Sequence, residues 1–134
     1  MNGNLQHIFL NVSNPKISFP FYIEFMGLLG YNIEFQGEKE LGLNNGVNEV
    51  WLRKAARASN FDRNSVGINH IAFRVPLKDE VDEFNEQFIV KNGLSTMFNS
   101  LKIFESFTSD YYAVYFEDPD GIKLEVTSYT FDFD

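Results

Sequence analysis

The sequence predicts an α+β fold built from two βαβββ modules, and three observations support this prediction. A strand-like pattern that contains one histidine occurs near the start of the chain and again near its middle. A helix-length segment follows each copy, and three short strand-like runs separated by turn residues follow each helix. The order strand, helix and three strands therefore occurs twice within 134 residues.

The two copies of the histidine pattern cover residues 5–12 and 68–75. Both read as an apolar residue, Asn or Gln, His, Ile, three variable positions and Val, so that His7 and His70 take the same place. These are the only two histidines of the chain. Because internal repetition indicates a repeated structural unit, each copy is predicted to be the first strand of a module.

Two segments, residues 15–30 and 77–93, are predicted to be helices, because the first begins at Pro15, the second follows Pro76, and each ends near a glycine. The second has apolar residues at helical spacing, and these are Leu77, Val81, Phe84 and Phe88. The first is apolar on more sides and contains Pro20. Its expected buried stripe consists of Ile17, Phe21, Phe25 and Leu28.

Short alternating or aromatic runs supply the remaining strands. The first half contains them at residues 31–36, 39–43 and 47–53, and the second at residues 95–99, 111–116 and 122–127. The turn Asp118-Pro119-Asp120-Gly121 separates the last two.

Neither half is long enough to bury a sheet face alone. We therefore expect residues 1–134 to form one domain, with modules 1–55 and 67–129 joined by a polar linker, 56–66. The modules are expected to pair into a curved, cleft-forming mixed sheet. A linker of this length permits pairing within one chain or between the two chains of a homodimer.

Composition narrows the range of functions. The formal charge of −8 disfavours binding to nucleic acid and to anionic membranes. The chain has no cysteine, so any metal ion must be held by histidine, carboxylate or water. The first residues lack the features of a signal peptide, and a cytoplasmic location is the expectation.

Strand parity places the polar residues of both halves on one side of the predicted sheets, because alternate residues of a strand face opposite sides. In each copy of the repeat the aliphatic residues share the face that suits the helix. His7 and His70 therefore lie on the other face, which Arg74 shares. In the final strand, Glu125 also lies on the face away from the helix.

Alignment of the last strands of the two halves places Trp51 where the second half has Glu125. Glu49 lies one step away on the same face. Pairing of the modules would bring His7, His70 and Glu125 together, and this set of donors suits Fe, Mn, Co, Ni or Zn. Such an ion would act as a Lewis acid on an oxygen of the substrate.

Other residues on these strands are candidates for contact with a small-molecule substrate. Trp51, Tyr112 and several Phe residues would supply the apolar wall that such pockets need, and Arg74 is a further candidate for substrate binding. Glu49 is the candidate general base.

With these motifs the chain resembles the vicinal oxygen chelate superfamily, which includes glyoxalase I, extradiol dioxygenases, fosfomycin-resistance enzymes and bleomycin-binding proteins. The similarity covers nearly the whole chain and is strongest in two segments, residues 67–75 and 112–126. It implies two βαβββ modules that enclose a cleft, with metal ligands on the first and last strand of each module. On this chain those positions are His7, the Trp51/Glu49 region, His70 and Glu125.

The sequence leaves three functions open. The first is a metal-dependent lyase, isomerase or oxygenase acting on a small oxygenated molecule. The second is a metal-free binding or resistance protein that sequesters an aromatic or cationic compound. The third is a catalytically silent module that dimerises through its sheet edges. A single histidine in a strand is more often structural than ligating, so the case for a metal depends on both repeat-equivalent histidines.

Overall fold

The computed structural model describes residues 1–130, and its chain divides into two compact units, Met1–Asn60 and Phe61–Asp134. The boundary between the units falls inside the predicted linker. The first unit consists of β1 (His7–Val12), α1 (Pro15–Leu28), β2 (Asn32–Gln36), β3 (Glu40–Asn44) and β4 (Glu49–Lys54). The second consists of β5 (His70–Arg74), α2 (Lys78–Phe84) with a π-helical continuation (Asn85–Val90), β6 (Met97–Ile103), β7 (Tyr112–Glu117) and β8 (Lys123–Ser128).

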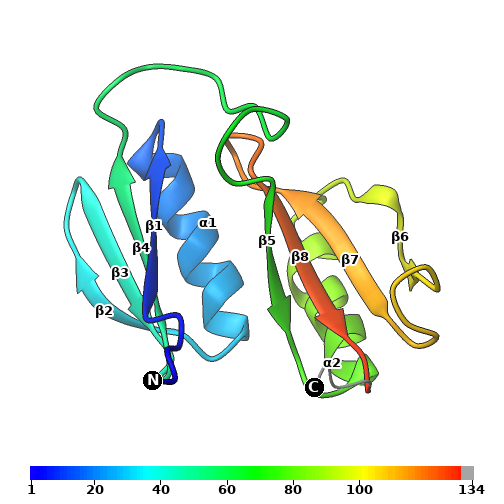
Figure 1. Ribbon diagram of the computed structural model, residues 1–134. Helices are drawn as coiled ribbons and strands as arrows, with labels where there is room; N and C mark the ends of the chain where they lie inside the picture. The colour runs from blue at the N-terminus through cyan, green and yellow to red at the C-terminus, as the bar shows by residue number, and fades with distance from the viewer. Residues whose placement is uncertain (131–134) are drawn as a thin grey trace. The chain divides into compact units, whose positions relative to one another are not determined.

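The predicted α+β architecture of two βαβββ modules is confirmed. Each unit contains one four-stranded mixed sheet, with strand order β1-β4-β3-β2 in the first and β5-β8-β7-β6 in the second. The first and last strands of each unit are parallel, and the other neighbours are antiparallel. In each unit one helix covers one face of the sheet (Figure 1). The opposite face of each sheet is not covered by the helix and is therefore available for a functional site.

Helix α1 begins where the sequence predicts it, because the Asn14 side chain accepts a hydrogen bond from the Lys16 N–H and Pro15 occupies the first turn. It ends before Gly30, whose φ of 87° suits glycine. The predicted buried stripe is correct at Phe25 and wrong at Ile17 and Leu28, which are 58% and 41% exposed, while Phe21 is half-buried. The residues that α1 buries are Ser18, Phe19, Tyr22, Phe25 and Met26.

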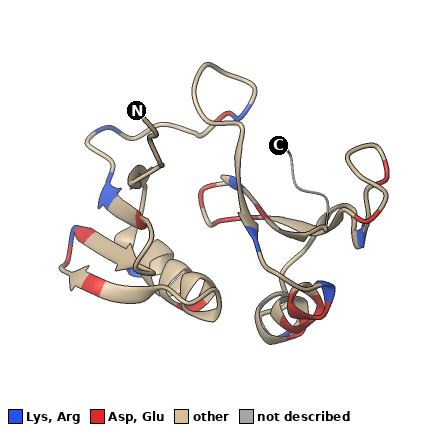
Figure 2. Ribbon diagram, turned by 60° about the horizontal axis from the view of Figure 1, so that its bottom comes forward, with Lys and Arg blue, Asp and Glu red and all other residues tan. Residues whose placement is uncertain are grey.

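Helix α2 and its π-helical continuation bury the face that the spacing predicts. Val81, Phe84 and Phe88 are buried, whereas Leu77 precedes the helix and is exposed. Acidic residues are frequent along this helical segment, as the red ribbon in Figure 2 shows. Phe84 and Phe88 pack on Phe116 of β7, with ring centroids 5.7 and 5.9 Å away. This aromatic cluster fixes the helix on its sheet.

The strand end before β8 is fixed by the turn that the sequence predicts. The Asp118 carboxylate is buried and accepts hydrogen bonds from the backbone N–H groups of Asp120 and Ile122, both at 2.8 Å. Gly121 completes the turn with a φ of 86°. The turn sets where β8 begins and thereby the positions of Lys123 and Glu125 along it.

Strand β6 is longer and less regular than the sequence predicts. It pairs with β7 at Met97 and again at Lys102, and the intervening segment departs from the ladder. Ser100 repairs part of this gap, because its hydroxyl accepts a hydrogen bond from the Tyr115 N–H at 2.9 Å. Phe98 lies within the irregular segment at a φ of 58°. The irregularity places the Phe98 ring against Tyr115, with centroids 5.3 Å apart.

None of the helices within residues 1–130 is long and apolar enough to cross a membrane.

Candidate functional site

The strand register relates the two modules residue by residue. In the first unit Trp51 lies beside Phe9, and in the second Glu125 lies beside Ala72, which occupies the place of Phe9 in the repeat. This register confirms that Trp51 is the counterpart of Glu125. The same comparison pairs His7 with Glu49 and His70 with Lys123. The two modules thus share a framework but carry different side chains at the same two positions.

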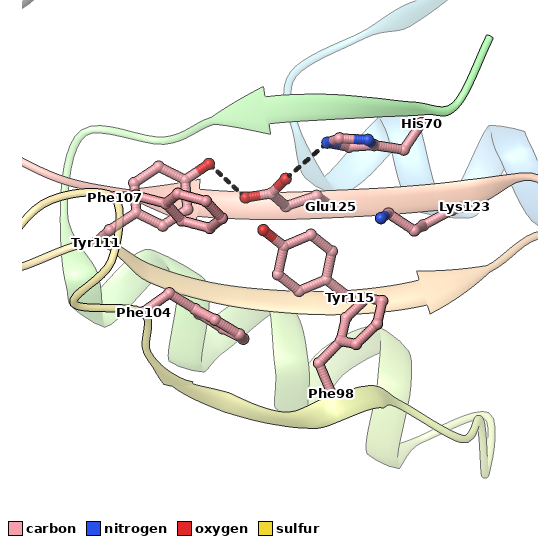
Figure 3. A pocket seen from close by; sticks show the side chains of 8 residues that line it. All are labelled: His70, Phe98, Phe104, Phe107, Tyr111, Tyr115, Lys123 and Glu125. Carbon is pink, nitrogen blue, oxygen red and sulfur yellow. Dashed lines mark hydrogen bonds and ion pairs between the residues drawn. The ribbon is translucent and has the colours of Figure 1, made fainter. Parts of the chain in front are cut away.

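The second unit contains a cavity of about 520 Å³ on the side of its sheet away from α2. Its lining is largely aromatic, with charged residues along β8 and one histidine from β5 (Figure 3). The lining residues are His70, Phe98, Phe104, Phe107, Tyr111, Tyr115, Lys123 and Glu125. A cavity of this size and composition is typical of a small-molecule site.

Glu125 is the buried carboxylate of this cavity, with an exposed fraction of 1%. The Tyr111 hydroxyl donates a hydrogen bond to its Oε1, and Oε2 lies 3.4 Å from His70 Nε2. Burial, followed by the hydrogen bond to Glu125, raises the pKa of Tyr111, and burial followed by the charge of Glu125 raises the pKa of Tyr115. Both tyrosines therefore remain protonated and able to donate at neutral pH.

Asn69 orients the His70 imidazole. The His70 Nδ1 lies 2.7 Å from the Asn69 Oδ1, while the Asn69 Nδ2 donates to the Arg63 carbonyl at 3.3 Å. An amide oxygen only accepts, so Nδ1 carries a proton. The other ring nitrogen, Nε2, is then directed at the Glu125 carboxylate. In the first unit Gln6 does the same, since its Oε1 contacts His7 Nδ1 and its Nε2 donates to Glu49.

His70 and Glu125 fit two ligands of one divalent ion. Nε2 and Oε2 face each other at 3.4 Å, and in the neutral imidazole with its proton on Nδ1 both are acceptors that a cation between them would bind. Two donors bound to one ion at about 2.1 Å each lie roughly 3.0–3.4 Å apart when the angle is between octahedral and tetrahedral. Within either unit, no cluster of three or more His, Asp or Glu side chains that could hold a metal occurs among residues 1–130.

Glu49 lies in a polar cluster on the first unit. Its carboxylate accepts hydrogen bonds from Gln6 and Asn44. The bond from Gln6, followed by one from Glu34, lowers the pKa of Glu49, and the shared bond raises the pKa of Glu34. Glu49 is thus a carboxylate at neutral pH, which is the form that a general base requires.

Trp51 lies in an aromatic stack across the first sheet. Its ring stacks on Phe9 and Phe35, with centroids 6.1 and 6.3 Å away. The indole lies flat over Gly42, where an added Cβ would come within 2.6 Å of a ring carbon. Only glycine leaves this space. The position equivalent to Glu125 therefore offers an apolar surface instead of a carboxylate.

The structure does not bring two of the predicted substrate-binding residues to the cavity. Tyr112 points to the helix side, where its hydroxyl donates to Asp82, and burial followed by this bond raises the pKa of Tyr112 to about 12. Arg74 donates to the Tyr129 carbonyl at 2.7 Å and lies over the Tyr129 ring. The polar tyrosines that reach the cavity are instead Tyr111 and Tyr115.

Sequence reasoning missed several residues of this site. The alternation of β8 already placed Lys123 on the face of Glu125, but a lysine near a turn gave no other signal. The amide before each histidine was part of the repeat pattern, and its role becomes visible only from the contacts of Asn69 and Gln6.

Replacement of Asn69 with Leu is expected to release the His70 ring from its fixed tautomer. Without the amide acceptor, Nδ1–H loses its partner, and the Nε2–H form should gain population at the expense of the form that can bind an ion. The expected result is a change in the ¹⁵N shifts of His70 and a loss of about 10- to 100-fold in affinity for Mn²⁺.

The matched control is Asn64→Leu, which alters an exposed asparagine outside the cavity. Unchanged His70 shifts in Asn69→Leu would show that Asn69 does not set the tautomer.

The two βαβββ modules define a glyoxalase-type fold, and comparisons with known proteins agree. No family model matches the chain. YqjT, an uncharacterized protein of Bacillus subtilis (strain 168), is 30% identical over 129 residues, which cover 92% of this chain and 98% of YqjT.

A solved Bacillus halodurans protein, provisionally described as a glyoxalase, superposes with a TM-score of 0.85 at 25% identity, over 95% of this chain and 96% of its own. A glyoxylase/bleomycin resistance protein/dioxygenase domain from Frankia sp. EAN1pec has a TM-score of 0.72 at 19% identity, over 99% and 96% of the two chains, and shows the shared fold alone. The chain therefore belongs to the same family as YqjT, and its fold is that of the glyoxalase/bleomycin resistance/dioxygenase proteins, consistent with the vicinal oxygen chelate superfamily.

Proposed function

We propose that this protein is a divalent-metal-dependent lyase, isomerase or oxygenase that acts on a small oxygenated molecule. The observation that carries the proposal is the approach of His70 Nε2 and Glu125 Oε2, which face each other at 3.4 Å beside an aromatic cavity. His7 is the proposed third ligand, because it occupies the same place in its repeat and its ring is held by Gln6 in the same way.

A divalent ion held by these residues would supply Lewis acidity toward an oxygen of the substrate. Tyr111 keeps the Glu125 carboxylate in place through its hydrogen bond to Oε1, which leaves Oε2 directed at His70. The phenyl rings of Phe98, Phe104 and Phe107 offer an apolar surface to the body of the substrate and exclude water around it. Glu49 is proposed as the group that accepts a proton from the substrate.

A second candidate function is metal-free binding or sequestration of a small molecule. The observation that favours it is Trp51, which takes the place of a carboxylate and stacks with Phe9 and Phe35. An aromatic surface of this kind binds flat or cationic compounds without a metal. The two functions differ in whether the protein takes up an ion.

Metal titration separates the two functions. The purified protein, stripped with EDTA, is titrated with Mn²⁺, Fe²⁺, Co²⁺, Ni²⁺ and Zn²⁺ in a calorimeter. The enzyme proposal expects saturable binding of one of these ions, with weaker binding in both His7→Ala and His70→Ala. Failure of all five ions to bind the unmodified protein would leave the binding function. Weaker binding in His70→Ala alone would exclude His7 as a ligand.

A further inference from the structure

Lys123 is the one lysine or arginine among the lining residues of the cavity. Within residues 1–130, no carboxylate oxygen lies within 4.0 Å of the Lys123 ammonium nitrogen, which is the limit for an ion pair. Its ammonium forms cation–π contacts instead, since Nζ lies 4.9 Å from the ring centroid of Phe98 and 5.5 Å from that of Tyr115. A half-buried ammonium that faces a cavity without a counter-ion is prepared to bind an anion.

The carboxylates that could neutralise Lys123 are engaged elsewhere. Glu117 is its cross-strand partner on β7, and the Glu117 carboxylate forms an ion pair with Arg63 at 3.2 Å. Glu125 lies two residues further along β8, and its oxygens contact Tyr111 and His70. The positive charge of Lys123 is therefore directed to the cavity, on the same side of β8 as Glu125 (Figure 3).

The repeat provides independent support for a special role of this position. Lys123 lies beside His70 in the parallel ladder, and its counterpart beside His7 is Glu49. The two modules thus carry opposite charges at the same place in the fold. In the second module the cation at this position lines the aromatic cavity. Because the first module folds with a carboxylate at the same place, the fold itself does not require a positive charge here.

We propose that the cavity takes a small molecule with an apolar body and one anionic group, a carboxylate or a phosphonate, which Lys123 binds. The rings of Phe98, Phe104 and Phe107 contact the body. The anion displaces water from the ammonium and pairs with it in surroundings of low polarity, where such a contact is strong. This inference rests on the proposed function only in that an oxygen of the same molecule would face His70 and Glu125.

Three probes of similar shape test the proposal by calorimetry. Phenylacetate and phenylphosphonate carry the anionic group, and phenylacetamide is the neutral analogue. We expect the unmodified protein to bind at least one of the two anions about tenfold more tightly than phenylacetamide. Lys123→Met should abolish this preference, and Lys123→Arg should retain most of it. The anion that shows the larger preference identifies the class of the natural ligand.

Lys78→Met is the matched control. Lys78 also lies over a tyrosine ring, 4.6 Å from the centroid of Tyr112, but it belongs to α2 and does not line the cavity. Its variant should bind all probes like the unmodified protein. Equal affinity of the unmodified protein for the anions and the amide overturns the proposal, as does failure of both anions to bind at millimolar concentration.

The titrations are run in EDTA and again with Mn²⁺, so that this proposal and the metal proposal can fail separately. A preference for anions in EDTA that depends on Lys123 supports the anion site, whether or not the protein takes up Mn²⁺. If the unmodified protein and Lys123→Met take up Mn²⁺ equally and the unmodified protein shows no preference for anions, the anion site is excluded and the metal proposal is unaffected.

Discussion

Glu125→Gln is expected to lower the affinity for a divalent ion by more than about 100-fold, because a neutral amide oxygen replaces the buried carboxylate that we propose as a ligand. Gln has nearly the same shape as Glu, and its amide oxygen can still accept the hydrogen bond from Tyr111. The fold should therefore be preserved. Calorimetric titration with Mn²⁺ measures the affinity, and circular dichroism checks the fold.

The matched control for this variant is Glu86→Gln, which makes the same chemical change at an exposed position on the helical segment after α2. It should bind the ion like the unmodified protein. Equal ion affinity in the Glu125→Gln and Glu86→Gln proteins would remove Glu125 from the set of ligands.

Phe116→Ala is expected to destabilise the second unit by about 3–5 kcal/mol, which is the usual cost of a cavity at a fully buried phenylalanine. The Phe116 ring is completely buried between Phe84 and Phe88, so its loss removes the contacts that hold the helix on the sheet. Hydrogen exchange of the β7 and β8 amides in increasing urea measures the stability of this unit. Trp51 fluorescence reports on the first unit separately.

Phe107→Ala serves as the control, because this phenylalanine is 58% exposed at the cavity. Its truncation should cost about 1 kcal/mol or less. A loss of stability in Phe116→Ala no larger than in Phe107→Ala would show that the aromatic cluster does not hold the unit together.

The architecture could be predicted because the repeat and the hydrophobic periods agree with each other. The pattern around His7 and His70 marked both first strands, and the alternation of β8 correctly separated Glu125 from Leu124 and Val126. The equivalence of Trp51 and Glu125 followed from aligning two strands, and the ladders have that register. These predictions depend on local periodicity, which a sequence displays directly.

The residues that line the cavity could not be predicted from periodicity. Strand β7 carries large apolar or aromatic residues on both faces, so no alternation revealed that Tyr112 faces α2 while Tyr111 and Tyr115 face the cavity. Helix α1 posed a similar problem, because it is apolar around most of its circumference and offered several possible stripes. In both elements packing partners decided the orientation, and these are distant in sequence.

Trp51 packs against several residues of the first module, so substitutions at these positions depend on one another. Its ring fills the space above Gly42 and bridges Phe9 to Phe35, so a smaller acidic residue there would uncover the glycine backbone and separate the two phenyl rings. A carboxylate at position 51 would then require compensating substitutions at neighbouring positions as well. A single Trp51→Glu change is therefore expected to leave a packing defect over Gly42.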